Sequence, residues 1–429
     1  MKLIIKLLKY WISLIYWNNA PIDKVKKMQL RKFREVFEYA RENSPFYKQF
    51  YAENGVSDLV IRTWEDVEKV PVVEKSTLKQ CALEDILTCP INDDIKIHST
   101  SGSTGEPFQI AYSKYEDYTG HVRLFWLLMK HGYTPFKKMM LVTRNEPGQK
   151  FDVEKDVKFI GKLQHRLHCF EREVASIYDS PQSIISRIEN NRPFVLWTTP
   201  SAAFGIAEEL KHKNKRLSIP LLLLISENIS DDQALLFKER LCKRFINHYG
   251  CMEAPTMSYA FNNNDVQLTI PNFVLCEQVR KRKVAGNVVG DMVITNFVNK
   301  TMPFIRYSLG DFVEVLNEEN GMLRFGKIYG RINDIIEVNG EQIFHMRLSQ
   351  IFRGYTKCKQ YKLVQLSDGS LELQLIVADN QDDKEVKDEA EKMWNEKFPS
   401  IPIKVVLKKH LEIDQHTGKF KVIERIRTS

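Results

Sequence analysis

The chain has 429 residues, which is long enough for two or three structural units with substantial cores. Its hydrophobic fraction of 43% is that of a globular protein, and its net charge of +8 is spread along the chain, which gives little support to nucleic-acid binding. The seven cysteines are odd in number and form no CxxC pair. This pattern is typical of reduced thiols in a cytosolic protein and of neither a disulfide framework nor a closed zinc site.

The first seventeen residues, MKLIIKLLKYWISLIYW, are predicted to form a helix. It would span roughly 25 Å, short of the ~30 Å core of a bilayer, and its lysines disfavour both a transmembrane span and a cleaved signal peptide. Lys2, Lys6, Lys9 and Ser13 share one narrow stripe, and apolar residues surround it. Two interpretations follow: a helix lying in a membrane interface, or a helix packed on the protein's own surface or on a partner.

The segment from 137 to 250 predicts a parallel sheet, because apolar runs alternate there with helical patterns. An earlier helical pattern over 24–50 is interrupted at Asn43-Ser44-Pro45. Ser201 and Ser230 are expected to cap the second and third helices of the alternating segment. The predicted strands are Met139 to Val142, Phe194 to Trp197, Leu221 to Ile225 and Phe245 to Tyr249, and the predicted helices lie near 181–190, 202–213 and 231–243.

After residue 285 the pattern changes to short strands, and after Gly330 to a small α+β unit. We therefore predict an α/β protein with an amphipathic helix over 1–20, a large domain over 21–330 and a small domain over 331–429. The strands expected in the later segments are Gly290 to Thr295, Asp311 to Leu316, Met322 to Ile328, Tyr361 to Leu366, Leu371 to Val377 and Ile403 to Leu407, with a helix around 386–398.

Two motifs carry groups suited to a nucleotide. The loop His98-Ser-Thr-Ser-Gly-Ser-Thr-Gly-Glu-Pro107 offers hydroxyl and amide donors and glycines that admit an anion, although no Gly-Lys-Ser/Thr follows as in a Walker loop. Asn247-His-Tyr-Gly-Cys-Met-Glu253 places a ring and a carboxylate at the end of a predicted strand, where ligands bind in α/β sheets. Alone, each motif also fits ordinary structure: a flexible turn, or a core tyrosine with a surface glutamate.

Three further motifs follow in the chain. Pro303-Phe-Ile-Arg-Tyr-Ser-Leu-Gly-Asp311 offers a carboxylate that could accept hydrogen bonds from a ribose diol, or simply belong to a turn. Gly330-Arg-Ile-Asn-Asp-Ile-Ile-Glu-Val-Asn-Gly340 places a guanidinium at the boundary near residue 330. Thr417-Gly-Lys-Phe-Lys421 places a lysine on a turn near the end of the chain, where it could also be merely solvated.

In this order the five motifs resemble the adenylate-forming superfamily of acyl-CoA ligases, and most closely the phenylacetate-coenzyme A ligase-like branch with its relatives in capsular polysaccharide biosynthesis. The resemblance covers roughly residues 30 to 425. It implies a large ATP- and acid-binding domain with parallel sheets and a β subdomain, closed by a mobile C-terminal lid. It also implies two steps: a carboxylic acid and ATP give acyl-AMP and pyrophosphate, and an acceptor, usually coenzyme A, then takes the acyl group.

The resemblance assigns roles to individual residues. Tyr249, with Gly250 in its motif, would pack on the adenine, and Ser226, Glu227 and Asn228 would lie where the family passes that base. Glu253 would hold Mg²⁺, and Lys419, carried by the lid, would bridge the attacking carboxylate and the α-phosphate. The remaining nucleotide contacts would be Ser101, Gly102, Ser103, Thr104 and Gly105 with the phosphates, Asp311 with the ribose hydroxyls, and Arg331 with the ribose or a phosphate.

The chain departs from the family pattern in three places. Glu106 stands where the family often has lysine, Met252 where it has a hydroxyl residue, and Asn333 where it has the hinge aspartate. Some relatives carry a Cys/His metal site near the tyrosine-glycine motif, for which His248, Cys251 and Cys276 are the candidates here. Their irregular spacing is more typical of buried residues than of a zinc site.

The sequence thus leaves two hypotheses for function. The first is a cytoplasmic ligase that uses ATP and Mg²⁺ to activate a small carboxylic acid and transfers it to coenzyme A or to a sugar precursor in surface polysaccharide synthesis, at the inner face of a membrane if residues 1–17 bind there. The second is a catalytically silent nucleotide-binding scaffold, which Glu106 and Met252 suggest. Retention of Lys419 favours the first hypothesis, and the acid, the acceptor and the oligomeric state stay open.

Overall fold

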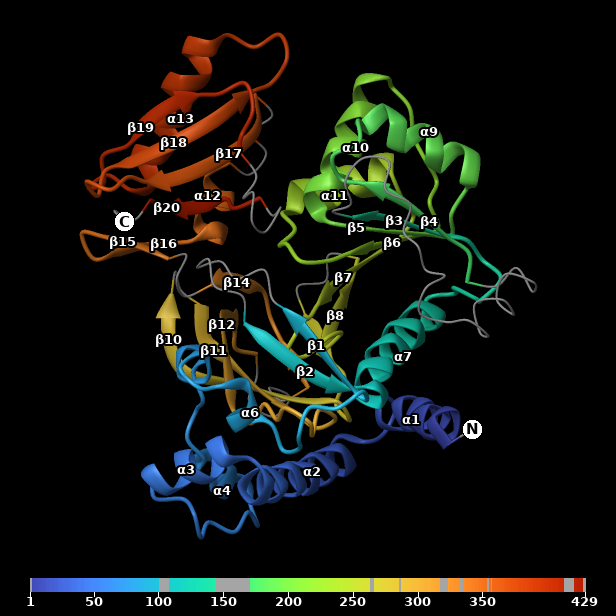
Figure 1. Ribbon diagram of the computed structural model, residues 1–429. Helices are drawn as coiled ribbons and strands as arrows, with labels where there is room; N and C mark the ends of the chain where they lie inside the picture. The colour runs from blue at the N-terminus through green and yellow to red at the C-terminus, as the bar shows by residue number, and fades with distance from the viewer. Residues whose placement is uncertain are drawn as a thin grey trace.

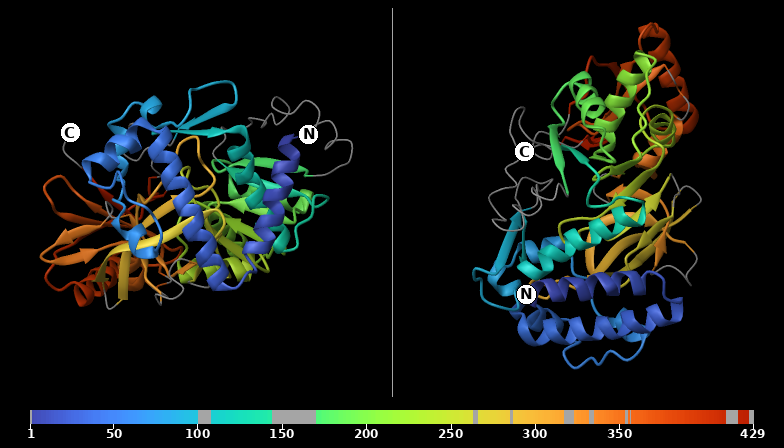
Figure 2. Two further views of the ribbon diagram at one scale, coloured as in Figure 1. Left: turned by 90° about the horizontal axis from the view of Figure 1, so that it is seen from below. Right: turned by 90° about the vertical axis from the view of Figure 1, so that its right-hand side faces the viewer.

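A computed structural model describes residues 2–99, 108–143, 170–262, 266–284, 287–316, 323–331, 335–352, 355, 357–412 and 420–426. Figure 1 shows helices α1 to α6 at the base, β-sheets in the middle, a sheet covered by α9 to α11 above them, and a C-terminal unit beside that sheet at the top. Figure 2 shows that α1 and α2 lie on the outer surface of the molecule. None of the described helices is long and apolar enough to cross a membrane.

The N-terminal helices confirm the predicted break at Asn43-Ser44-Pro45. Ser44 is the N-cap of α3 and Pro45 occupies its first turn, where a missing N–H costs nothing. The Ser44 hydroxyl accepts from Tyr47 N at 3.5 Å and donates to Ile86 O at 2.9 Å. The helices are α1 (Lys2–Trp17), α2 (Ile22–Asn43), α3 (Pro45–Glu53), α4 (Trp64–Lys69), α5 (Lys75–Lys79) and α6 (Leu83–Ile86).

The predicted parallel sheet is confirmed. In the described part of the chain the largest sheet has the order β13-β9-β8-β7-β6-β5-β3-β4, and β4, β3, β5, β6 and β7 pair in parallel. Leu221–Leu224 is fully buried, as expected for a central strand of a parallel sheet. The strands are β3 (Met139–Thr143), β4 (Arg172–Ser176), β5 (Val195–Thr198), β6 (Leu221–Leu224), β7 (Phe245–Tyr249), β8 (Ser258–Phe261), β9 (Gln267–Thr269) and β13 (Arg324–Phe325).

The helices of this region begin at capping residues, one of which was predicted wrongly. Ser230 caps α11 as expected, in a capping box with Gln233. Ser201 does not cap α10, because Pro200 is the first helical residue and Thr199 is the cap. The helices are α7 (Lys114–Lys130), α9 (Pro181–Asn191), α10 (Pro200–His212) and α11 (Asp231–Arg240).

A second sheet with the order β10-β11-β12-β14 lies beside the first and is antiparallel throughout. The expected strand from Met322 to Ile328 is wrong as a single element, because its residues divide between the two sheets. Gly326 lies at the division, where a Cβ would stand 2.4 Å from Glu314 Oε2. The strands are β10 (Val274–Val284), β11 (Asn287–Asn296), β12 (Tyr307–Glu314) and β14 (Ile328–Arg331), and a separate hairpin comprises β1 (Ile95–Ser99) and β2 (Gln109–Ser113).

The C-terminal unit has its own core and a sheet with the order β19-β18-β17-β20, which includes the predicted hairpin. Trp394 is fully buried there, and its indole N–H donates to Ile401 O at 2.8 Å. The elements are β15 (Ile336–Val338), β16 (Glu341–Ile343), α12 (His345–Ile351), β17 (Cys358–Gln365), β18 (Leu371–Val377), α13 (Asp383–Lys397), β19 (Lys404–Leu407) and β20 (Ile423–Arg425).

Candidate active site

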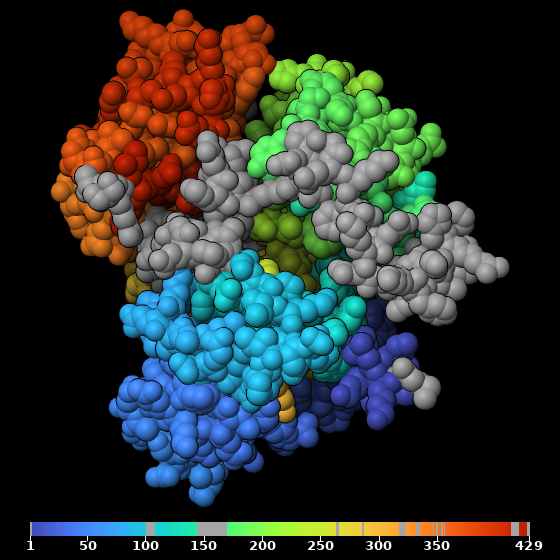
Figure 3. Space-filling model, viewed as in Figure 1, coloured from blue at the N-terminus to red at the C-terminus, as the bar shows by residue number. Residues whose placement is uncertain are grey.

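A cleft of about 2300 Å³ lies where the parallel sheet, the second sheet and the C-terminal unit meet. Figure 3 shows the hollow between the C-terminal unit, the side of the molecule that carries α10 and α11, and the β1–β2 hairpin. The carboxyl ends of the parallel strands line this cleft, and this edge of an α/β sheet is where ligands bind. The predicted residues that line it are Ser226, Glu227, Asn228, Tyr249, Gly250, Glu253, Asp311 and Arg331.

A hydrogen bond joins the end of β7 to the second sheet. The Tyr249 hydroxyl donates to Asp311 Oδ2 at 2.5 Å, and Arg331 Nε lies 3.9 Å from Asp311 Oδ1. Asp311 and Arg331 face each other because they are register partners of β12 and β14. Burial, with the Asp311 charge as the next cause, holds the pKa of Tyr249 well above its usual value, so the phenol stays a donor. Three predicted nucleotide-binding residues thus lie together.

Gly250 follows Tyr249 at a close backbone turn. A Cβ at this position would lie 2.7 Å from Thr256 N and 3.2 Å from Ala254 O, so only glycine fits without a shift of the backbone. The turn directs the chain from Tyr249 back toward the second sheet, where Glu253 is bound. Gly250 therefore has a structural reason to occupy the motif.

Glu253 is buried, and its carboxylate is held by two residues that the sequence reasoning missed. Lys75 Nζ and the Tyr307 hydroxyl each lie 3.1 Å from Glu253 Oε1. Asn296 Nδ2 also donates to the Glu253 carbonyl at 3.0 Å. Lys75 is 178 residues away in the chain, so no local spacing could have signalled it. Tyr307 lies in the PFIRYSLGD motif, in which the resemblance assigns a role to Asp311 alone.

The chemistry of this carboxylate fits Mg²⁺ bound together with a nucleotide. Mg²⁺ in nucleotide sites takes one or two protein carboxylates, with phosphates and waters as its other ligands. Glu253 offers one carboxylate, and the ammonium of Lys75 shows that a cation is stabilised beside it. The Lys75 side chain is 39% exposed, so its ammonium can move from Glu253 into solvent.

The segment after β6 lines the same cleft. Ser226 has φ of 71°, a left-handed conformation that turns the chain sharply after Leu224. Glu227 Oε2 accepts from the Ser201 backbone N–H at 2.9 Å and from its hydroxyl at 2.5 Å. Ser201, expected as a cap, instead ties α10 to the predicted adenine-binding segment. This placement leaves the role of Glu227 toward a nucleotide as a prediction.

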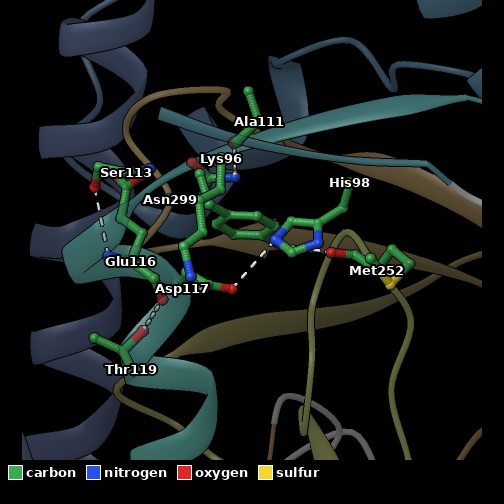
Figure 4. A network of polar contacts seen from close by, with 10 residues as sticks. Lys96, His98, Ala111, Ser113, Glu116, Asp117, Thr119, Met252 and Asn299 are labelled. Carbon is green, nitrogen blue, oxygen red and sulfur yellow. Dashed lines mark hydrogen bonds and ion pairs between the residues drawn. The ribbon is translucent and has the colours of Figure 1, made fainter. Parts of the chain in front are cut away.

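A polar cluster forms another wall of the cleft, shown in Figure 4. Lys96 Nζ lies 2.9 Å from Asp117 Oδ2, and His98 Nε2 lies 3.2 Å from Asp117 Oδ1. The Tyr112 hydroxyl donates to the Met252 carbonyl at 2.6 Å, which ties β2 to the tyrosine-glycine motif. His98, Asp117 and, one helical turn further along α7, His121 all line the cleft. This wall can therefore make hydrogen bonds with a ligand.

Several predicted residues lie outside the described part of the chain. These are Ser101, Gly102, Ser103, Thr104 and Gly105, together with Glu106, Asn333 and Lys419. Described residues close to two of these segments line the cleft. Ser99, at the end of β1, precedes the phosphate-loop motif, and Phe420 and Lys421 follow Lys419.

Two of the three zinc candidates have ordinary structural surroundings. His248 Nε2 lies 3.0 Å from Thr256 Oγ1, and Cys276 is fully buried on β10. Within the described ranges no group of three or more metal-binding side chains is found.

Comparisons with known proteins find relatives in sequence and in fold. No protein-family model matches the chain. The chain is 22% identical over 372 residues to phenylacetate-coenzyme A ligase of Pseudomonas putida (83% of this chain, 82% of the relative) and 22% identical over 327 residues to CapK of Staphylococcus aureus (72% and 69%).

The fold is similar to a solved structure of 2-hydroxyisobutyryl-CoA ligase in the postadenylation state, in complex with R3-HIB-AMP. The TM-score is 0.72 at 18% sequence identity, and the match covers 93% of this chain and 89% of the ligase chain. The same ligase with 2-HIB-AMP and CoA in the thioesterification state has a TM-score of 0.58. The fold is thus that of the adenylate-forming ligases. Within them the chain is related to the phenylacetate-coenzyme A ligase-like branch, as its motifs predicted.

Buried histidines make the stability of the protein sensitive to acid. Burial lowers the pKa of His248 to about 4, and burial, with the charges of Lys130 and Arg244, lowers that of His131 to about 4. An unfolded chain binds these protons near pH 6.5, so their neutral forms favour folding above that pH. We expect the free energy of unfolding to fall as the pH drops from 6.5 toward 4.

The measurement is urea unfolding at a series of pH values, with His131→Phe as the matched variant. Phenylalanine keeps the stacking on Phe261, whose ring centroid lies 4.6 Å away, but takes up no proton. The free energy of unfolding of this variant should therefore change less steeply with pH, by the equivalent of up to one proton per molecule. An unchanged slope would show that folding does not lower the pKa of His131.

Proposed function

We propose that this protein activates a carboxylic acid with ATP as an acyl-adenylate. The observation that supports the proposal is the Tyr249–Asp311 hydrogen bond, which joins an aromatic ring to a carboxylate beside Arg331 in one cleft. The Tyr249 hydroxyl occupies one oxygen of the Asp311 carboxylate and holds it in place. The other oxygen, on the side of Arg331, can accept hydrogen bonds from ribose hydroxyls. The Tyr249 ring can then lie beside the base.

In the proposed step an oxygen of the acid's carboxylate attacks the α-phosphorus of ATP. A P–O bond forms, the bond from the α-phosphorus to the bridging oxygen breaks, and pyrophosphate leaves. Lys419 would bridge the carboxylate and the α-phosphate, which lowers the barrier because it neutralises charge that develops in the transition state. Mg²⁺, held by Glu253, would neutralise the phosphate oxygens.

We also propose that the parts after residue 330 act as a lid over this cleft, with a hinge near Asn333. Phe420 and Lys421, the two described residues of the TGKFK motif, line the cleft. The TM-score is higher for the postadenylation state of 2-hydroxyisobutyryl-CoA ligase than for its thioesterification state, at the same 18% identity. This difference supports a lid position suited to the first step, from which it would swing away for the second.

The polar wall suggests the class of acid. A pocket for an apolar aromatic acid is lined mainly by apolar side chains, whereas His98, Asp117 and His121 line this cleft. A site that hydrogen-bonds a polar group of its substrate rejects analogues that lack this group, so such a wall favours polar ligands. We propose a small acid that carries hydroxyl or amino groups, in contrast to the phenylacetate named for the relatives.

The acceptor is proposed to be coenzyme A or an amine or hydroxyl of a sugar precursor in surface polysaccharide synthesis. The first follows the ligases among the relatives, and the second is motivated by the likeness to CapK. We place the reaction in the cytoplasm.

A second candidate function is a nucleotide-binding scaffold without catalysis. It is favoured by Met252, whose side chain lines the cleft and has no donor for an α-phosphate. The carbonyl of Met252 is engaged by Tyr112, so the backbone of this loop is fixed even though the hydroxyl is missing. The two candidates differ in whether the protein turns over ATP when an acid is present.

ATP–pyrophosphate exchange tests the proposal and the class of acid together. We expect exchange only when an acid is present, and faster exchange with hydroxy or amino acids than with phenylacetate. Asp117→Leu should reverse this preference, by about tenfold or more, because an apolar side chain replaces the charged acceptor. Val60→Leu, at an exposed position that does not line the cleft, is the control. Exchange with no acid of a broad panel would favour the scaffold.

A lysine variant tests the chemistry. Lys419→Ala should slow adenylate formation by roughly 10²-fold or more, because it removes a preorganised charge from the transition state. Nucleotide affinity should change little, and transfer from chemically synthesised acyl-AMP should survive. Lys409→Ala, at an exposed lysine before the same segment, is the matched control. Near-normal adenylate formation by Lys419→Ala would refute the assigned role.

A further inference from the structure

Helix α1 presents an apolar face to solvent. At about 100° per residue, six large side chains occupy one continuous arc of about 120° on the helix. Each is between 46% and 62% exposed, which is far more apolar surface than scattered hydrophobic residues leave on a protein. The six residues of this apolar arc are Ile4, Ile5, Leu8, Ile12, Ile15 and Tyr16.

A different face of α1 is packed on the protein. Tyr10 and Leu14 are buried, and the Tyr10 hydroxyl accepts from Arg123 Nη1 of α7 at 3.0 Å. Asn272 Nδ2 donates to Ser13 Oγ at 3.1 Å. The helix is therefore fixed to the body by one face while the apolar arc points away from it. Figures 1 and 2 show α1 on the outside of the molecule, at the end opposite the C-terminal unit.

The third face of α1 carries its charge. Lys2, Lys6 and Lys9 lie along one edge of the apolar arc and are exposed, and Lys6 Nζ also lies 5.7 Å above the Tyr115 ring. The helix contains no aspartate or glutamate. An apolar surface bordered by lysines is complementary to lipid tails beneath anionic headgroups. A symmetric antiparallel contact between two copies of α1 would instead bring two lysine edges together.

We infer that α1 docks this protein on the surface of an anionic membrane through the apolar arc, with Lys2 and Lys9 at the headgroups. This inference rests on α1 alone and does not depend on adenylate formation. It joins the two interpretations of the sequence, because one face of the helix packs on the protein while another is free for lipid. Since α1 lies away from the C-terminal unit, docking leaves the cleft open to solvent.

The test is cosedimentation of the full chain with vesicles. Wild-type protein should bind vesicles that contain phosphatidylglycerol, and less so as salt is added, because the lysine attraction is screened. Leu8→Ser/Ile12→Ser should lower the partition coefficient at least about tenfold. Lys2→Gln/Lys9→Gln should remove the preference for phosphatidylglycerol over pure phosphatidylcholine. Deletion of α1 is avoided because Tyr10 and Leu14 belong to the core.

The matched control is Val60→Ser/Ile91→Ser, which changes two exposed aliphatic residues outside α1 (49% and 44% exposed) and should bind as the wild type does. All variants should keep the wild-type melting temperature, since the altered side chains are exposed. Wild-type binding by Leu8→Ser/Ile12→Ser, or no binding by the wild type, would overturn the inference. So would light scattering that shows a wild-type dimer which this variant converts to a monomer, because a second copy would then cover the arc.

Discussion

Strand β12 fixes the short loop from Tyr249 to Glu253 at both of its ends, and the geometry of the cleft depends on this attachment. Asp311 accepts from Tyr249, and Tyr307 donates to Glu253. Tyr307 and Asp311 are four residues apart on one strand, so the spacing between the two ends of the loop is set by β-structure. Gly250 makes the intervening turn possible, because any Cβ there would strike the Thr256 backbone. The Tyr249 ring and the Glu253 carboxylate are thereby held at a constant distance from each other.

The same attachment explains why the site needs two sheets. The parallel sheet supplies the ends of β6 and β7, and the antiparallel sheet supplies Asp311 and Arg331 as register partners. Neither sheet alone brings an aromatic ring, two carboxylates and a guanidinium together. Lys75, from a helix near the N-terminus, completes the neutralisation of the buried Glu253. Residues from four distant parts of the chain thus share one cleft.

The sequence predicted the elements with strong periodicity and the motif residues that lie next to strand ends. Tyr249, Asp311 and Arg331 could be placed together because their motifs resemble a family, whereas Lys75 could not, since its partner Glu253 is 178 residues away. The cap of α10 was misjudged because Ser201 looks like a cap, although Pro200 starts the helix one residue earlier. The division of one expected strand into β13 and β14 depends on the close approach of Gly326 to Glu314, which periodicity does not reveal. For α1, the lysine stripe was visible in the sequence, but the face that packs on α7 required the tertiary structure.

The most direct test of the account is a crystal structure of the protein with AMP. We expect the ribose hydroxyls within hydrogen-bond distance of Asp311, the base beside Tyr249, and an intact Tyr249–Asp311 hydrogen bond. AMP bound elsewhere, or bound in the cleft with its ribose away from Asp311, would contradict the assignment of this loop and strand as the nucleotide site.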